Sequence, residues 1–232
     1  MQLTYRQERW RCVCAGLLET AGNTFLLLLA VRHFQAGSVA KALVAGGGSG
    51  GLLLSPLAVN LTHRLGWPLT RAASRILFLG FLASVVAALC PRDFAGVYAV
   101  GCVLALASAS TVIPLMTQVY QDNYPVEQRG QLYSRAFMLR ILAAIVFGFV
   151  GGQWLEPDPW VPHLLPGVIT ALEQFPDRFR LVLLTFAGAL AVASWAVHRI
   201  PSEPFRQPAA AHPLSGWRFV HTDRWFRQAL IA

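Results

Sequence analysis

Charged residues are scarce in this chain of 232 residues. They make up 13% of it, whereas soluble domains carry about 25%. Hydrophobic residues account for 55%, and the mean hydropathy is +0.50. The apolar residues fall in long blocks rather than in scattered positions. This composition excludes an ordinary soluble domain and predicts an integral membrane protein whose main partner is the lipid bilayer.

Cysteine is also rare. The four cysteines are Cys12, Cys14, Cys90 and Cys102. None forms a Cys-x-x-Cys pair, and no histidine cluster adjoins them, so the sequence predicts no metal site and no cofactor. We interpret these residues as small buried hydrophobic side chains.

Acidic residues are outnumbered, with 11 Asp and Glu against 19 Lys and Arg, for a net charge of +8. The basic residues lie in the gaps between apolar blocks rather than on one face or in one run. That distribution suits an anionic lipid surface. It argues against nucleic acid as a partner.

Strand-like alternation is missing from the apolar blocks, each of which has about 20 residues, the length of a membrane-crossing helix. We therefore predict an all-α membrane protein with six transmembrane helices. We expect a kink at Pro114. A tail at 1–11 precedes the bundle at 12–199, and a tail or linker at 200–232 follows it. The predicted spans lie at about 12–31, 39–61, 69–90, 94–119, 132–154 and 179–197.

The basic residues also predict the orientation. With six spans, fourteen of the 19 Lys and Arg fall on the side of both termini. This bias places both termini in the cytoplasm of a multi-pass protein, which we assign to the plasma (inner) membrane. The fourteen are Arg6, Arg9, Arg11, Arg64, Arg71, Arg75, Arg129, Arg135, Arg140, Arg199, Arg206, Arg218, Arg224 and Arg227.

A glycine run with Ser49 at its centre, residues 46–51, matches the Gly-x-Ser-Gly pattern of intramembrane serine proteases. A protease needs a base within about 3 Å of the serine hydroxyl. His198 is predicted at the membrane edge, too far from a serine in the middle of a span. We therefore interpret the run as a packing surface and predict that the chain is not an enzyme. An intramembrane protease using Ser49 is kept as an alternative.

Polar side chains inside the spans are the candidates for a solute or ion pathway. Glu19 and Asn23 are one helical turn apart in the first span, on the same face. Ionisable groups in a span usually face a cavity or a partner helix. Two interpretations of Glu19 stay open: a pathway contact and a paired glutamate that holds helices together. Arg140 in the fifth span either faces a cavity or extends to the cytoplasmic surface, and its position favours the surface slightly.

The link between the second and third spans contains His63, Arg64 and Gly66. It resembles the Gly-x-x-x-Asp-Arg-x-Gly-Arg-Arg motif of the major facilitator superfamily, with His63 in the place of the aspartate. The link between the fourth and fifth spans, with Pro125, Arg129 and Gly130, is similar to the corresponding link of many members.

The chain as a whole resembles the amino-terminal six-helix half of such a transporter. The resemblance implies alternating-access transport of a small solute and a role of these two links in gating the cytoplasmic side. Pro125 opens its turn, and Arg129 is placed to cap carbonyls or to bind lipid phosphate.

The resemblance also implies a second six-helix bundle, because members have about twelve helices. The residues at 223–232 resemble the segment that leads into a seventh helix. We therefore expect either a fragment whose carboxy-terminal half is missing or a half-size protein that pairs with a second copy. A non-transporting membrane scaffold or accessory subunit is the remaining alternative.

Overall fold

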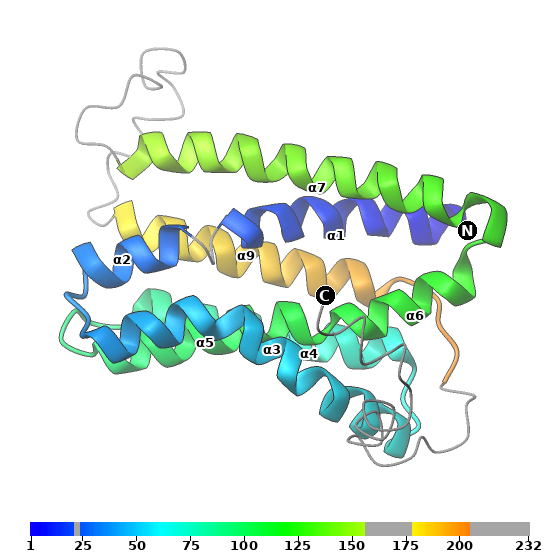
Figure 1. Cartoon of the computed structure of the whole chain (residues 1–232), viewed down its shortest axis with the longest axis horizontal. Helices are drawn as coiled ribbons and strands as arrows, with labels where there is room; N and C mark the ends of the chain where they lie inside the picture. Colours follow the sequence, from blue (N-terminus) through cyan, green and yellow to red (C-terminus); the bar gives the residue numbers. More distant parts are fainter. Residues whose placement is uncertain (21–23, 156–177, 205–232) are drawn as a thin grey trace, which may run out of the picture.

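The computed structural model describes residues 1–20, 24–155 and 178–204 (Figure 1). Over these residues the chain is helical, and the only strand-like pairing is an isolated bridge between Pro68 and Pro204. The described helices are α1 (Gln2–Thr20), α2 (Leu26–Arg32), α3 (Ser38–Arg64), α4 (Leu69–Leu89), α5 (Ala95–Thr111), α6 (Ile113–Asn123), α7 (Val126–Leu155) and α9 (Arg178–His198).

Within the described residues, five helical segments are long and apolar enough to cross a bilayer, and α5 and α6 together form one of them. This finding indicates an integral membrane protein and confirms the second to sixth predicted spans as apolar helices. Many of their large apolar side chains point outward, Leu53 with 81% of its surface exposed. The five are Ser38–Arg64, Leu69–Leu89, Ala95–Asn123, Val126–Gln153 and Phe179–His198.

The first predicted span differs from what the structure describes. The range 12–31 falls on α1 and α2, of which α2 has only 7 residues and α1 carries several charges. Helix α1 also runs through the predicted tail at 1–11, because Glu8 and Arg11 form an ion pair within it instead of facing water. A sixth span therefore stays a prediction.

The helices pack in a row whose order differs from their order in the chain. Helix α7 packs on α1, α1 on α9, α9 on α4, α4 on α5, and α5 on α3. Figure 1 shows α7, α1 and α9 above α5, α3 and α4. Helix α1 therefore packs against α7 on its outer side and against α9 on its inner side.

Two prolines shape the long helices. Pro114 follows the point where α5 ends and α6 begins, so the predicted kink is confirmed. Pro56 lies inside α3 and has no N–H to donate to the carbonyl of Leu52. The hydroxyl of Ser55 donates to that carbonyl at 2.7 Å instead. A buried serine thus satisfies the acceptor that the proline leaves free.

Small residues bring the helices close together. A Cβ placed on Gly51 of α3 would lie 2.7 Å from the Cα of Ala107 on α5. The hydroxyl of Thr111 donates to the carbonyl of Gly51 at 2.9 Å in the same crossing. Gly47 packs on α5 as well, so the predicted packing role is confirmed for these two glycines. Gly46 has open space around it.

One end of the bundle gathers the N-terminus, the α3–α4 turn, the α6–α7 turn and the end of α9 (Figure 1). These are the segments that an even number of crossings would place on one side. The segment after α9 joins two of them. Ser202 bonds to the backbone N–H and the hydroxyl of Thr70 at 3.1 and 2.7 Å, and the side-chain amide of Asn123 donates to the carbonyl of Pro201 at 2.8 Å.

Candidate functional site

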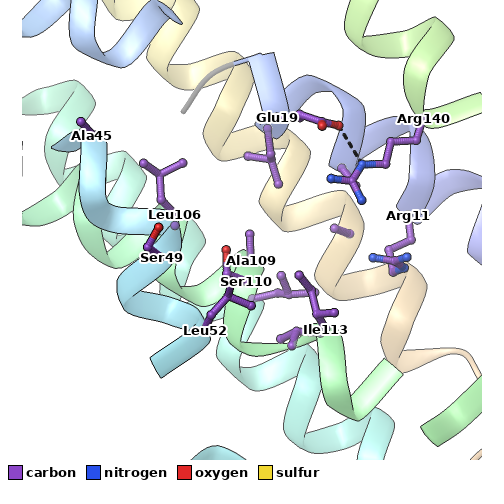
Figure 2. Close-up of a pocket in the computed structure, with 16 residues that line it drawn as sticks. Arg11, Glu19, Ala45, Ser49, Leu52, Leu106, Ala109, Ser110, Ile113 and Arg140 are labelled. Carbon is purple, nitrogen blue, oxygen red and sulfur yellow. Dashed lines mark hydrogen bonds and ion pairs between the residues drawn. The ribbon is translucent and has the colours of Figure 1, made fainter. Parts of the chain in front are cut away.

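A cavity of about 330 Å³ lies between the α1–α7 pair and the α3–α5 pair (Figure 2). Its walls are made mostly of small and aliphatic side chains. Three charged side chains, Arg11, Glu19 and Arg140, also line it. A mostly apolar pocket with a few convergent polar groups is the usual form of a small-molecule site.

Glu19 and Arg140 form an ion pair on the cavity wall. The Arg140 Nε donates to a Glu19 carboxylate oxygen at 2.9 Å. The Glu19 side chain remains 45% exposed and the Arg140 side chain 31% exposed. The structure thus brings two of the three predicted pathway residues together, and Arg140 faces the cavity rather than the surface. The third, Asn23, lies outside the described residues.

The position of Arg140 follows from where α7 begins. The helix starts at Val126, before the predicted start of the span at 132. Arg140 is therefore about 21 Å along its axis, near the middle of a helix of 30 residues. A side chain at that depth cannot reach either end of the helix, and the nearest opposite charge is Glu19.

Gly16 sets the spacing of α1 and α7 beside this pair. A Cβ at Gly16 would collide with the carbonyl oxygen of Arg140 and would lie 3.0 Å from the Cβ of Ala143. The hydroxyl of Thr20 donates across the same crossing to the carbonyl of Ala144 at 3.1 Å. The backbone of α7 at Arg140 therefore lies directly against α1, one turn before Glu19.

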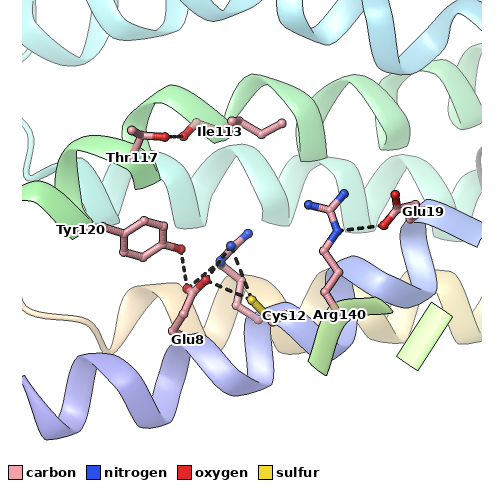
Figure 3. Close-up of polar contacts among 8 residues, drawn as sticks. Glu8, Cys12, Glu19, Ile113, Thr117, Tyr120 and Arg140 are labelled. Atoms are coloured by element: carbon pink, nitrogen blue, oxygen red, sulfur yellow. Dashed lines mark hydrogen bonds and ion pairs between the residues drawn. The ribbon is translucent and has the colours of Figure 1, made fainter. Parts of the chain in front are cut away.

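A second carboxylate cluster lies on the same face of α1, about three turns from Glu19 (Figure 3). Glu8 accepts two hydrogen bonds from Arg11 at 2.8 and 2.7 Å, one from the Cys12 thiol at 3.1 Å, and one from the Tyr120 hydroxyl. Only 3% of the Glu8 side chain is exposed. Every lone pair of this carboxylate faces a donor.

Sequence reasoning missed this cluster, because it placed Glu8 and Arg11 in a polar tail. The signal was present in their spacing. Glu8, Arg11 and Cys12 recur at intervals of three and four, so they share one helical face. Tyr124 lies nearby, just beyond the end of α6, and burial, then the charge of Glu8, raises its pKa.

Ser49 lies on α3 and lines the cavity. The cavity lining includes no histidine among the described residues, and α3 carries His63 far along its own axis. Within the part of the chain that the structure describes, no group of three His, Cys, Asp or Glu is arranged to hold a metal ion. Over the described ranges, the cavity lining therefore places no histidine next to Ser49.

The α3–α4 turn contains His63, Arg64 and Gly66. Gly66 has a φ of +60° and follows the last turn of α3. Its N–H bonds to the carbonyl of His63 at 3.0 Å, and the N–H of Trp67 bonds to the carbonyl of Thr62 at 3.2 Å. This is a Schellman ending, which needs the left-handed conformation that glycine adopts freely. Gly66 is thus explained by helix termination, and Arg64 is exposed.

The α6–α7 turn contains Pro125, Arg129 and Gly130. The guanidinium of Arg129 donates to the carbonyls of Gln121 and Tyr124 at 2.8 and 3.3 Å. It caps the end of α6, as the sequence suggested. Pro125 precedes α7 and accepts from the N–H of Arg129 at 3.0 Å. Gly130 is exposed with open space around it, and nothing in the structure explains its identity.

Comparison with known proteins finds no matching family model, no matching curated protein and no matching solved structure.

Proposed function

We propose that the chain forms the six-helix bundle of a secondary transporter, with α1 and α2 together as the first span and both termini in the cytoplasm. The bundle moves a small solute across the plasma membrane by alternating access and carries out no covalent chemistry. The proposal keeps the sequence resemblance to the amino-terminal half of the major facilitator superfamily. A second six-helix bundle, either a missing carboxy-terminal half or a second copy, completes the pathway.

One observation carries the proposal: the Glu19–Arg140 pair lies partly exposed on the wall of a cavity, and Arg140 is near the middle of the apolar helix α7. Charges in such a position are costly in a bilayer unless they serve a cavity or a partner. A purely structural carboxylate would be expected to be buried and saturated with hydrogen bonds, as that of Glu8 is.

The two turns at the proposed cytoplasmic end complete the mechanism. Alternating access requires one bundle to rock against the other around a fixed site. Residues 201 and 202 tie the start of α4 to the end of α6, since Thr70 bonds Ser202 and Asn123 bonds Pro201. The turns that carry Arg64 and Arg129 would therefore move together as parts of one rigid body.

A flux assay in proteoliposomes tests the proposal. The full chain is reconstituted and offered a panel of labelled amino acids, sugars, organic anions and organic cations. We expect a gradient-driven flux for at least one class. Glu19→Gln should reduce it at least tenfold, because the carboxylate faces the cavity. Glu127→Gln, which changes an exposed glutamate in the first turn of α7, should leave it unchanged.

Two results would contradict parts of this proposal. A folded wild-type protein that moves no member of the panel would contradict transport by two copies of this chain. A flux that survives Glu19→Gln at the wild-type rate would remove the ion pair from the pathway.

A further inference from the structure

A second, larger hollow lies on the opposite face of α5 from the cavity. It is a groove of about 800 Å³ between the second half of α3 and α4, with α5 as its floor. Figure 1 shows α3 running obliquely to α7, α1 and α9. Leu57 and Leu61 of α3 face Ile76 and Leu79 of α4 across the groove. Its volume lies within the range of about 300–1,000 Å³ found for ligand sites.

The walls of the groove offer almost no free hydrogen-bonding group. The three hydroxyls that line it each donate to a backbone carbonyl: Thr62 to Ala58 at 2.7 Å, Ser108 to Ala105 at 2.7 Å, and Thr111 to Gly51 at 2.9 Å. A polar ligand would lose its hydration here without gaining partners. The body of the groove therefore suits a hydrocarbon chain.

One end of the groove is basic. Arg75 lines it, and its guanidinium carbon lies 4.0 Å from the ring centre of Trp67. Stacking uses the face of the guanidinium and leaves its N–H edges available for a phosphate. Arg71 is one turn away on the same face of α4, and Arg64 ends α3 next to the groove residue Leu65.

These three arginines are exposed, and none pairs with a carboxylate among the described residues. Elsewhere in the structure, Arg11 and Arg140 each form an ion pair with a glutamate. Within the described residues, the charge of these three guanidiniums is therefore not neutralised by a salt bridge.

We propose that the groove binds one acyl chain of an anionic phospholipid, with the phosphate held by Arg75 and the neighbouring Arg64 and Arg71. An apolar slot with unpaired guanidiniums at one end matches a molecule with a hydrocarbon tail and an anionic head. A helix of another bundle would fill the slot but would need carboxylates at one end to meet the arginines. The proposal is independent of transport, since a scaffold with this groove would bind the same lipid.

Native mass spectrometry of the full chain tests it. The protein is released from mixed micelles that contain equal amounts of phosphatidylglycerol and phosphatidylcholine with identical palmitoyl and oleoyl chains. We expect one retained lipid per chain, with phosphatidylglycerol preferred about fivefold or more, since each arginine near an anionic head contributes about that factor. Arg75→Gln should lower the preference about fivefold. Arg135→Gln, an exposed arginine on α7, should not change it.

A second variant tests the slot rather than the charge. Ala58→Trp places a large side chain in the groove, so retention of both lipids should fall at least fivefold while helicity by circular dichroism stays unchanged. If this variant does not fold, Arg75→Gln decides alone.

Three outcomes would overturn the proposal. If the wild type retains phosphatidylglycerol and phosphatidylcholine in the same ratio as in the micelles, the bound lipid is ordinary solvating lipid. An equal loss in Arg75→Gln and Arg135→Gln would mean general charge attraction. A doubled mass without lipid would mean that a second copy occupies the groove.

Discussion

Helix α1 carries two paired glutamates on one face, Glu8 with Arg11 of the same helix and Glu19 with Arg140 of α7, and the two pairs differ in burial and in hydrogen bonding. Glu8 is 3% exposed and accepts hydrogen bonds from Arg11, Cys12 and Tyr120. Glu19 is 45% exposed and accepts one hydrogen bond, from Arg140. The first carboxylate is saturated and enclosed, whereas the second lines the cavity and, among the described residues, has one oxygen without a donor.

The difference teaches which pair is structural and which is available for function. A buried carboxylate with a full set of donors fixes α1 against α6 and has no capacity for another ligand. A half-exposed pair contributes little to stability because water screens it. It can therefore be rearranged at low cost when a solute enters.

The largest effect is expected for Glu8→Ala. Removing the carboxylate leaves the Arg11 guanidinium largely buried, with a charge that no longer has a partner. Breaking a buried pair in this way costs about 3–5 kcal/mol. Reversible unfolding in mixed micelles, followed by circular dichroism, measures the loss. A loss below about 1 kcal/mol would mean that Glu8 is not enclosed as described.

An intermediate effect is expected at Gly16, which lies between the two pairs along α1. Gly16→Ala adds a methyl group that collides with the carbonyl oxygen of Arg140. Forcing α1 and α7 apart should cost about 1–3 kcal/mol. It should also weaken the Glu19–Arg140 contact without touching Glu8 and Arg11, which share one helix.

The matched control for Gly16 is Gly46→Ala on α3. Nothing lies within 4 Å of a Cβ at Gly46. Alanine favours a helix over glycine by up to about 1 kcal/mol, so this variant should be unchanged or slightly more stable in the same unfolding assay. Equal losses in both variants would mean that the α1–α7 crossing is not close.

The smallest effect on stability is expected for Glu19→Gln. The pair is half exposed, and such pairs contribute about 0–1 kcal/mol. The unfolding free energy should therefore stay within about 1 kcal/mol of the wild type, although flux is expected to fall. A loss as large as that of Glu8→Ala would place Glu19 in the same structural class and would remove the contrast between the two pairs.

The apolar blocks predict much of the fold, because a membrane helix needs a length and a composition that are visible in the sequence. The ranges near 39–61, 69–90 and 179–197 agree closely with α3, α4 and α9. The kink at Pro114 follows from the chemistry of proline. Helix α1 was harder, because its charges resemble those of a solvated tail until Tyr120, far along the chain, provides a partner for Glu8.

The site was predictable only in part, for a related reason. An ionisable residue inside an apolar block marks Glu19 and Arg140 as candidates, since such a position is costly. Their pairing depends on α7 beginning at Val126 and on the close approach at Gly16, and neither is visible in composition. Gly66 matched a motif, but the structure explains it by the end of α3. A sequence match and a local folding requirement can coincide at one residue.

The most direct test of the contrast is the chemical accessibility of the two carboxylates. The folded chain in micelles is treated with a water-soluble carbodiimide and an amine, and labelled glutamates are mapped by mass spectrometry, with exposed Glu127 as the reference. The account predicts that Glu19 is labelled at least tenfold faster than Glu8, because only Glu19 opens onto the cavity. Equal labelling of the two, or faster labelling of Glu8, would contradict it.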